Sequence, residues 1–294
     1  MRHGIVILPQ QPWAEAQHRW IQAEEMGFDH AWIYDHLSWR SLADEQWYAT
    51  IPTLTAAASV TSRIGLGTFV ASPNYRHPVP FAKELATLDD VSAGRFLLGV
   101  GSGGTGFDAT VLGQDELTPR QRHARFDEFV RGLDELLRFE DPGSGGISFS
   151  GDWFTAVNAR MVGAPAQRPR MPFVVAAEGP RGLRLTAELA DGWLTLGRTA
   201  DTLDEWWQIV ADTAARMDDA LEKAGRASAS LDRYLNLDGA PQFSLESVDT
   251  WEDAVGRADA LGFTDVIGHW PRADGIYAGK ESVLTEIASR FALA

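Results

Sequence analysis

The sequence predicts an α/β protein that folds as a (β/α)8 TIM barrel with insertions on the C-terminal, catalytic face. The first observation is a junction, found four times, in which an amphipathic helical pattern ends in glycine and an apolar run begins. The second is that each apolar run is short and nearly continuous, which is typical of parallel strands buried on both faces. The third is that eight such runs occur, separated by stretches with one apolar stripe of helical spacing.

The predicted strands lie near residues 4–8, 29–34, 64–70, 96–101, 172–177, 192–196, 231–237 and 264–269. The seventh alternates between polar and apolar residues and is the least regular. The glycines of the four junctions follow a helix directly, at the C′ position where the left-handed conformation favours this residue. They are Gly27, Gly94, Gly192 and Gly262. A doubly wound sheet is the rival fold, but the turn after the first strand reads LPQQPW instead of G-x-G-x-x-G.

Two segments are too long for simple βα connections. They are the Gly/Pro-rich insertions Gly103–Thr118, after the fourth strand, and Asp141–Pro172, before the fifth. Long loops in a compact domain are typically lids over a site or disordered segments. The length of 294 residues allows two domains or one barrel, and no linker divides the chain. We therefore expect a single barrel domain over residues 1–294.

Composition limits the partners of the protein. The chain has 26 Lys and Arg against 41 Asp and Glu, a net charge of −15, which disfavours nucleic acid and anionic membrane surfaces. It contains no cysteine, which excludes disulfides and thiolate chemistry and fits a reducing cytoplasm. The apolar run Ile5–Leu8 is too short for a signal peptide, and no stretch approaches the ~20 apolar residues of a membrane span. We expect a cytoplasmic protein that acts on a small molecule.

The C-terminal ends of the strands are where the active site of such a barrel lies. Asp35-His36, at the end of the second strand, is the most chemically capable pair there, because a histidine beside a carboxylate exchanges protons near neutral pH. A structural role for His36 is equally compatible with the sequence. His269 is a weaker candidate that we expect to pack or to hydrogen-bond locally. His3 stands alone at the opposite end of a strand, so we expect no metal site.

Two further segments could approach a flat or anionic ligand. The run GVGSGGTG, residues 99–106, offers unhindered amides, although it matches no phosphate-binding motif and could form a plain turn. The segment Glu178-Gly179-Pro180 begins a helix directly after the fifth strand. Its free amides, with Arg181, predict an anion site, and a tight βα turn is the alternative. The candidates for lining a substrate pocket are Trp13, Trp39, Arg198 and Trp270.

The most specific pattern in the chain is IGLGTFVASPNYRHPVPFAKELATLDDVSAGRFLLGVGSG, residues 64–103. With Gly27–His36, Ala177–Pro180 and Leu189–Trp193, it resembles the bacterial luciferase-like family of flavin- and deazaflavin-dependent oxidoreductases. The resemblance covers essentially the whole chain. It independently implies a (β/α)8 barrel with insertions on the catalytic face.

The resemblance also implies roles for individual residues. It places Asp35 and His36 near the reactive face of the coenzyme ring, with His36 as the proton-handling group, held by a nearby carboxylate or carbonyl. It implies a non-proline cis peptide bond between Phe69 and Val70, beneath the ring. The expected coenzyme contacts are Phe69, Val70, Gly101, Ser102, Gly103, Glu178, Gly179, Pro180, Arg181, Thr195 and Gly197. We expect the phosphate at the helix start after the fifth strand, with Arg181 or Arg198 beside it.

The activity implied by the resemblance is hydride transfer to, or oxygenation of, a small organic substrate by a reduced flavin-type coenzyme. The luciferases carry an arginine for the flavin phosphate after strand four, where this chain has Ser102. This departure favours the deazaflavin coenzyme F420, with an FMN-dependent monooxygenase as the alternative. A non-catalytic flavin-binding protein on the same fold is a second alternative. We expect a homodimer.

Overall fold

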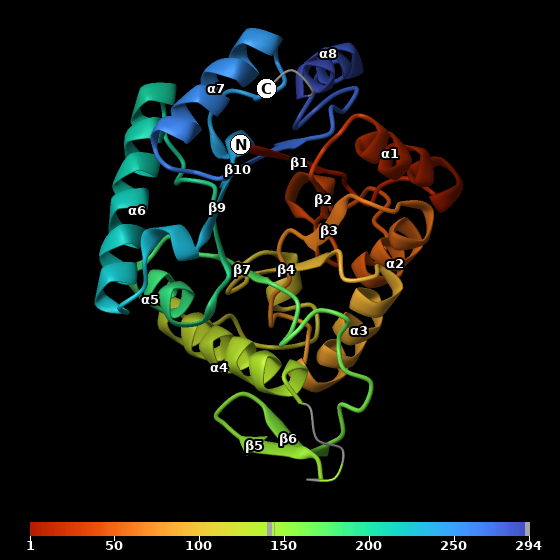
Figure 1. Cartoon of the computed structure of the whole chain (residues 1–294), viewed down its shortest axis with the longest axis vertical. Coiled ribbons are helices and arrows are strands. Elements are labelled where there is room, and N and C mark those ends of the chain that lie inside the picture. Colours follow the sequence, from red (N-terminus) through yellow and green to blue (C-terminus); the bar gives the residue numbers. More distant parts are fainter. Residues whose placement is uncertain (140–142, 144, 292–294) are drawn as a thin grey trace.

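The computed structural model describes residues 1–139, 143 and 145–291 and confirms the predicted barrel. All eight barrel strands are parallel, and the sheet closes because β1 pairs with both β2 and β10 (Figure 1). The strands are β1 (Arg2–Val6), β2 (His30–Ile33), β3 (Gly65–Thr68), β4 (Phe96–Val100), β7 (Phe173–Ala176), β8 (Gly192–Thr195), β9 (Asp232–Asn236) and β10 (Asp265–His269). Each lies within one or two residues of a predicted run.

Helices form a ring outside the strands, as Figure 1 shows. They are α1 (Trp13–Glu25), α2 (Thr50–Val60), α3 (Pro78–Val91), α4 (Pro119–Leu137), α5 (Pro180–Leu189), α6 (Leu203–Lys223), α7 (Val248–Ala260) and α8 (Glu281–Phe291). Short 3-10 turns are η1 (Arg40–Leu42), η2 (Phe107–Ala109), η4 (Ser228–Ser230) and η5 (Leu237–Gly239). No helix in the described ranges is long and apolar enough to span a membrane.

Two apolar cores result from the alternation of side chains along each strand. In β1 and the residues after it, Ile5 and Ile7 face the helices, whereas Val6 and Leu8 face the barrel interior. The inner core consists of Val6, Leu8, Trp32, Tyr34, Trp39, Leu42, Phe69, Val174, Leu194, Tyr234 and Ile267. The barrel is therefore a filled structure, and Tyr34, Trp39 and Phe69 fill its C-terminal end.

The glycine junctions follow the prediction in three of four cases. Gly27, Gly94 and Gly262 have φ angles of 86°, 78° and 78°, in the left-handed region. The prediction for Gly192 is wrong, because this residue is not in that region and begins β8. Its small size is required for another reason: a Cβ there would lie 2.8 Å from the Tyr234 ring.

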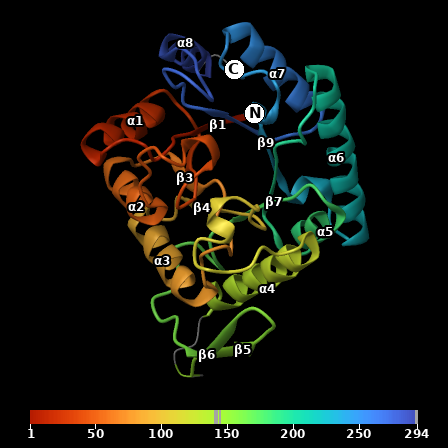
Figure 2. The same ribbon diagram turned by 180° about the vertical axis from the view of Figure 1, so that it is seen from behind.

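The second insertion contains an antiparallel hairpin that its sequence pattern did not predict. Strands β5 (Ile147–Ser150) and β6 (Thr155–Ala159) pair with each other and lie beyond α4 in both Figure 1 and Figure 2. The Glu128 carboxylate on α4 accepts the amide hydrogens of Trp153 and Phe154 and so ties the hairpin to the helix layer. Residue 141, where the predicted insertion begins, and residues 292–294 of the expected single domain lie outside the described residues.

Candidate functional site

The ends of β3 and β4 meet at the C-terminal face of the barrel. The peptide bond between Phe69 and Val70 is cis, as the family resemblance implies. The Phe69 ring faces the barrel interior and stacks on Tyr34, with 5.9 Å between the ring centroids. A Cβ at Gly101 would lie 2.8 Å from Val70 Cγ2, so the chain passes this point without room for a side chain. The two strand ends thus lie against each other here.

Asp35 does not hold its neighbour His36. Its buried carboxylate binds Arg76, with Nε–Oδ2 and Nη2–Oδ1 distances of 2.6 Å each. Burial would lower the pKa of the Arg76 guanidinium, but the hydrogen bonds to Asp35 outweigh it and raise the pKa. The guanidinium also lies over the Phe81 ring, 4.2 Å from its centroid. Asp35 therefore fixes the segment after β3, and it is not the carboxylate that holds His36.

His36 is held by a carboxylate from the first insertion. Its Nδ1 lies 2.5 Å from Asp108 Oδ2, and the Leu37 amide donates to Asp108 Oδ1 over 2.9 Å. The Asp108 side chain, on η2, is 4% exposed, whereas that of His36 is 30% exposed. Since the carboxylate accepts a hydrogen from Nδ1, the other ring nitrogen, Nε2, is left to exchange a proton with solvent or a ligand.

A second histidine–aspartate pair lies inside the barrel. His269 Nδ1 is 2.8 Å from Asp238 Oδ2, and both side chains are at most 1% exposed. His269 Nε2 is 2.8 Å from the Tyr34 hydroxyl, which is 2.9 Å from the Tyr277 hydroxyl. His269 therefore hydrogen-bonds locally, as expected. Tyr277 is only half-buried, so the hydrogen-bonded chain comes closest to solvent there.

The carboxylate sets the direction of this chain of hydrogen bonds. Because Asp238 has no hydrogen to give when ionised, His269 Nδ1 donates to it, as does the His269 amide over 2.7 Å. In neutral imidazole Nε2 then accepts from Tyr34, and Tyr34 accepts from Tyr277. A proton added to Nε2 reverses the direction of both hydrogen bonds. This row of hydrogen-bonded groups can therefore pass a proton between Tyr277 and His269. Burial raises the pKa of Tyr277 to about 12, which keeps this hydroxyl neutral at physiological pH.

Three of the predicted coenzyme contacts form one cluster at the ends of β7 and β8. Glu178 Oε1 accepts from the Thr195 hydroxyl and from the Leu196 amide, and the Gly197 amide donates to Thr195 Oγ1. The other oxygen, Glu178 Oε2, is buried and has no partner among the described residues. Burial raises the pKa of this carboxyl. The cluster therefore presents an unused acceptor.

The start of α5 is open, as the segment Glu178-Gly179-Pro180 predicts. Pro180 occupies the first turn, no side chain caps the helix at Gly179, and a Cβ at Gly179 would meet no atom within 4 Å. The first amides of a helix lack intrahelical acceptors, so they are free for a ligand. Arg181 and Arg198 are both exposed.

The predicted tryptophans separate into two layers. Trp39 lies in the inner core, with its ring centroid 5.1 Å from that of Tyr34. Trp13 packs against the apolar core between the strands and the helices. Trp270 is buried in that core, and its Nε1 donates to Glu281 over 2.9 Å. The expectation that Trp270 lines a pocket at the strand ends is therefore wrong, and for Trp13 it stays a prediction. For Trp270 the reason is alternation, since the preceding His269 takes the inward direction.

Sequence reasoning missed the partners of both histidines. Asp108 lies in the short turn η2, 72 residues from His36, and Tyr277 lies outside any helix or strand, 243 residues from Tyr34. For Asp238 a signal was available, because this residue lies just two positions beyond the end of β9. Among the residues that the structure describes, no group of three or more His, Asp or Glu side chains is placed to hold a metal ion.

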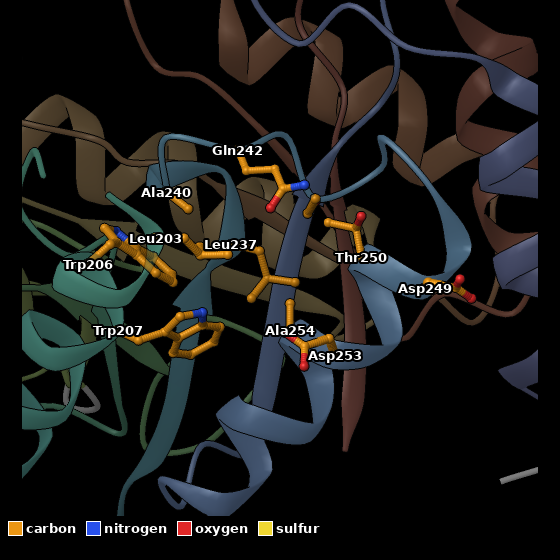
Figure 3. A pocket seen from close by; sticks show the side chains of 11 residues that line it. Leu203, Trp206, Trp207, Leu237, Ala240, Gln242, Asp249, Thr250, Asp253 and Ala254 are labelled. Carbon is orange, nitrogen blue, oxygen red and sulfur yellow. The ribbon is translucent and has the colours of Figure 1, made fainter. Parts of the chain in front are cut away.

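Two hollows in the described part of the chain lie in the helix layer. A cavity of about 280 Å³ lies between α6, α7 and the η5 segment (Figure 3). It is bordered by Trp206 and Trp207 on one side and by Thr250 and Ala254 on the other (Figure 3). A wider groove of about 720 Å³ runs between α4, α5 and the β5–β6 hairpin. Neither includes His36 or His269, so both are separate from the strand-end site.

Known proteins resemble this chain in sequence and in fold. An F420-dependent glucose-6-phosphate dehydrogenase from Kineococcus radiotolerans is 32% identical over 238 residues, 79% of this chain and 66% of the relative. For the same-named enzyme of Nakamurella multipartita, the values are 34% identity, 74% of this chain and 60% of the relative. The chain thus spans less than two thirds of the length of these relatives.

A solved structure extends the comparison to the fold. The coenzyme F420-dependent tetrahydromethanopterin reductase from Methanopyrus kandleri superposes with a TM-score of 0.74 at 20% identity, covering 98% of this chain and 96% of that one. The luciferase-like monooxygenase family matches residues 1–263. The match runs from β1 through α7 and ends just before β10, and it confirms the family inferred from residues 64–103. The chain therefore belongs to the luciferase-like monooxygenase family.

Proposed function

We propose that this protein is an oxidoreductase that uses coenzyme F420 to transfer a hydride to or from a small organic substrate. The observation that carries the proposal is the His36–Asp108 pair at the end of β2, which combines a fixed tautomer with a partly exposed ring. The names of the dehydrogenases from Kineococcus and Nakamurella support F420 as the coenzyme. The family membership supports the placement of the coenzyme at the strand ends.

The donors and acceptors at the strand ends fit a flavin-type coenzyme. Glu178 Oε2 is a buried acceptor without a partner in the described ranges, and it suits the hydroxyl groups of a ribityl chain. Gly179 leaves open space at this face, since a Cβ there would meet no atom within 4 Å, and part of a coenzyme could approach the backbone closely. The uncapped start of α5 adds free amides.

The residues of this chain supply position and proton transfer. A bound deazaflavin ring supplies the hydride chemistry, for which no side chain here is suited. His36 takes the proton from a substrate hydroxyl at Nε2 during oxidation, or gives it to a carbonyl oxygen during reduction. Asp108 keeps Nδ1 protonated and stabilises the imidazolium form. The rings of Tyr34, Trp39 and Phe69 exclude water beneath the site.

FMN with oxygen activation is the alternative chemistry, supported by the monooxygenase name of the family. A flavin-binding protein without catalysis is a second alternative on the same fold. The positioned His36–Asp108 pair favours the enzyme, because binding alone has no use for a proton-exchanging group. We also propose a single barrel domain, a homodimer and a cytoplasmic location, which rest on the sequence alone. Sedimentation velocity of the purified protein tests the dimer.

The coenzyme assignment is tested by titrating the purified protein with oxidised F420 and with FMN. We expect F420 to bind more tightly and to raise the melting temperature more at saturation. Turnover is then followed by the loss of the visible absorbance of F420 with glucose 6-phosphate and with small secondary alcohols. If neither coenzyme protects the protein against unfolding, the proposal is wrong. If FMN binds more tightly, the FMN alternative replaces it.

A further inference from the structure

The cavity between α6, α7 and the η5 segment, named here the α6–α7 cavity, has mostly apolar walls. Its volume is about 280 Å³. The apolar side chains that border it are Leu203, Trp206, Trp207, Leu237, Ala240 and Ala254 (Figure 3). An apolar cavity of about 150 Å³ is enough to hold a benzene ring. The α6–α7 cavity therefore has room for a one-ring compound that carries a polar substituent.

Two tryptophans form one side of this cavity. The ring centroids of Trp206 and Trp207 lie 4.8 Å apart with the ring planes at 75°, and both side chains are buried. Trp206 Nε1 donates to the Leu196 carbonyl over 3.1 Å, which fixes the orientation of its ring. Because the two rings pack against each other, this wall is formed before a ligand binds, and that lowers the cost of binding.

One buried polar atom on the cavity wall has no partner. Ser244 borders the cavity and is 3% exposed, and its Oγ makes no hydrogen bond with any described residue. A Cβ at Gly268, on β10, would lie 3.1 Å from this oxygen, so the hydroxyl lies on the strand side of the cavity. Buried hydroxyl groups are normally hydrogen-bonded, because burial removes them from water. The Ser244 hydroxyl can therefore donate one hydrogen bond to a ligand and accept others.

The neighbouring polar groups are hydrogen-bonded within the protein. Thr250 Oγ1 lies 2.8 Å from Ser247 Oγ, and Gln242 Nε2 donates to Glu246 over 2.7 Å. Five other side-chain atoms in the described ranges are buried without a partner, but none belongs to a residue that borders either of the two hollows. An unused hydroxyl and an apolar space of ligand size thus occur together at Ser244.

The charges around the cavity indicate the class of ligand. Asp249 and Asp253, in the first two turns of α7, border the cavity and are exposed. Asp253 pairs with Arg257 over 2.9 Å, whereas Asp249 has no cationic partner in the described part of the chain. These carboxylates disfavour an anion. Since a charge of either sign is costly to bury among apolar side chains, an uncharged ligand fits best.

We propose that the α6–α7 cavity binds a small uncharged organic molecule with an apolar body and one hydroxyl or carbonyl group, which hydrogen-bonds to Ser244. The inference does not depend on the proposed function, because the cavity is separate from the strand-end site. The cavity does lie beside the buried histidine pair. The Ser244 amide donates to Asp238 Oδ1 over 2.8 Å, and Asp238 Oδ2 accepts from His269. Ser244 would therefore contact the ligand with its side chain and Asp238 with its backbone.

The test uses four one-ring probes that differ in one substituent: benzyl alcohol, toluene, benzylamine and benzoate. Titrations of the purified protein are followed by the indole N–H signals in proton–nitrogen NMR spectra, assigned with Trp206→Phe and Trp207→Phe. We expect benzyl alcohol to bind with a Kd below roughly 1 mM, a modest affinity for a molecule of this size. It should shift the signals of Trp206 and Trp207 and leave those of Trp32 and Trp193, which are buried elsewhere. Benzoate should bind at least about tenfold more weakly, because its charge would be buried.

Two variants test the contacts within the cavity. Ser244→Ala should weaken benzyl alcohol binding by about 3- to 10-fold, the range for one neutral hydrogen bond, and change toluene binding by less than about twofold. Ala254→Leu should weaken both by more than about tenfold, because the larger side chain takes the space of the ring. Ser59→Ala on α2 and Ala260→Leu at the end of α7, both at exposed positions, are the matched controls and should leave both constants unchanged.

Several outcomes would overturn the inference. Equal losses of benzyl alcohol and toluene binding in Ser244→Ala would show that the hydroxyl makes no contact with the ligand. Tighter binding of benzylamine than of benzyl alcohol would contradict the uncharged class. The site itself is wrong if no probe binds at up to about 5 mM, or if the shifts spare both Trp206 and Trp207. If Ala254→Leu does not fold, the indole shifts in the unmodified protein decide. The coenzyme titration is a separate measurement, so the proposed function can fail or hold independently.

Discussion

The two histidine–aspartate pairs have the same chemistry and opposite surroundings. His36–Asp108 joins the end of β2 to a surface insertion, and the histidine side chain is 30% exposed. His269–Asp238 joins the ends of β10 and β9, and the histidine is fully buried. The first pair has one open ring nitrogen, whereas both nitrogens of the second are bonded within the protein. Burial therefore separates a pair that is open to a ligand or solvent from a pair whose hydrogen bonds all lie within the barrel.

The largest expected effect is at the open pair. His36→Ala should lower turnover by roughly 10²- to 10⁴-fold, the usual contribution of a general acid or base, with little change in coenzyme affinity. Steady-state kinetics and a coenzyme titration of the same variant give the two quantities. His18→Ala, on α1, is a control for removal of a histidine. Unchanged turnover with a working substrate would make His36 structural and remove the contrast between the pairs.

The buried pair should show its effect in stability. Asp238 accepts hydrogens from the ring and the amide of His269 and from the Ser244 amide. Asp238→Asn leaves buried donors unmatched and should lower the free energy of unfolding by about 3 to 5 kcal/mol. Urea denaturation followed by circular dichroism measures this change. A loss below about 1 kcal/mol would contradict the assigned role, since that is the size of one ordinary hydrogen bond.

Asp108→Asn sharpens the comparison because it makes the same change in the open pair. We expect turnover to fall by roughly 10- to 100-fold, as is usual when the partner that orients a functional histidine is removed. The free energy of unfolding should fall less than in Asp238→Asn, because solvent can reach His36. When turnover and the free energy of unfolding are measured in both variants, we expect Asp108→Asn to change mainly turnover and Asp238→Asn to change mainly stability. If Asp108→Asn lowers the free energy of unfolding more than Asp238→Asn does, the inference that burial separates the roles of the two pairs is wrong.

A smaller effect is expected along the hydrogen-bonded tyrosines. Tyr34→Phe leaves His269 Nε2 buried without a partner and should cost about 1 to 3 kcal/mol of stability. Tyr277→Phe removes only the outer hydroxyl and should cost about 1 kcal/mol. Tyr48→Phe, at an exposed tyrosine, is the control. Equal effects of Tyr34→Phe and Tyr277→Phe would show that the outer hydroxyl matters as much as the inner one.

The smallest effect concerns acid stability outside both pairs. Glu24 accepts amide hydrogens from Ser62, Arg63 and Ile64, and these bonds outweigh burial and lower its pKa from 4.5 to about 2. A depressed pKa means that the stabilisation is complete above the unfolded value and is lost as the pH falls from 4.5 toward about 2. Glu24→Gln should flatten the pH dependence of the melting temperature in that range. Glu25→Gln, at an exposed position, is the control and should leave this pH dependence unchanged. If Glu24→Gln keeps the pH dependence of the unmodified protein, the role given to Glu24 is wrong.

The regular part of the fold could be predicted because strands and helices leave a periodic pattern. Every barrel strand lay where an apolar run predicted it, and His36 was found because strand ends are the place for chemistry in a barrel. The partners could not be predicted in this way. Asp35 and His36 are adjacent in sequence, but consecutive residues of an extended chain point to opposite sides, so one binds Arg76 and the other Asp108.

The hairpin was missed for a related reason. Strands β5 and β6 are four and five residues long, lie among glycines and polar residues, and pack only on one side against α4. Short strands of that kind carry little of the apolar signal that identified the barrel. The tie to α4 through Glu128 is a contact between distant residues, which a single sequence does not show.

The pairing of β1 with β10 has a consequence for the synthesis of the protein. Arg2 binds Asp265 across 263 residues, so β1 is synthesised long before its second neighbour, β10, exists. Until then the growing sheet has two open edges, and open edges invite pairing with other chains. The ion pairs of Arg2 with Asp265 and Asp232 lie where β1 meets the last strands of the barrel. Nascent chains halted before β10 should therefore depend on chaperones more than chains halted after it.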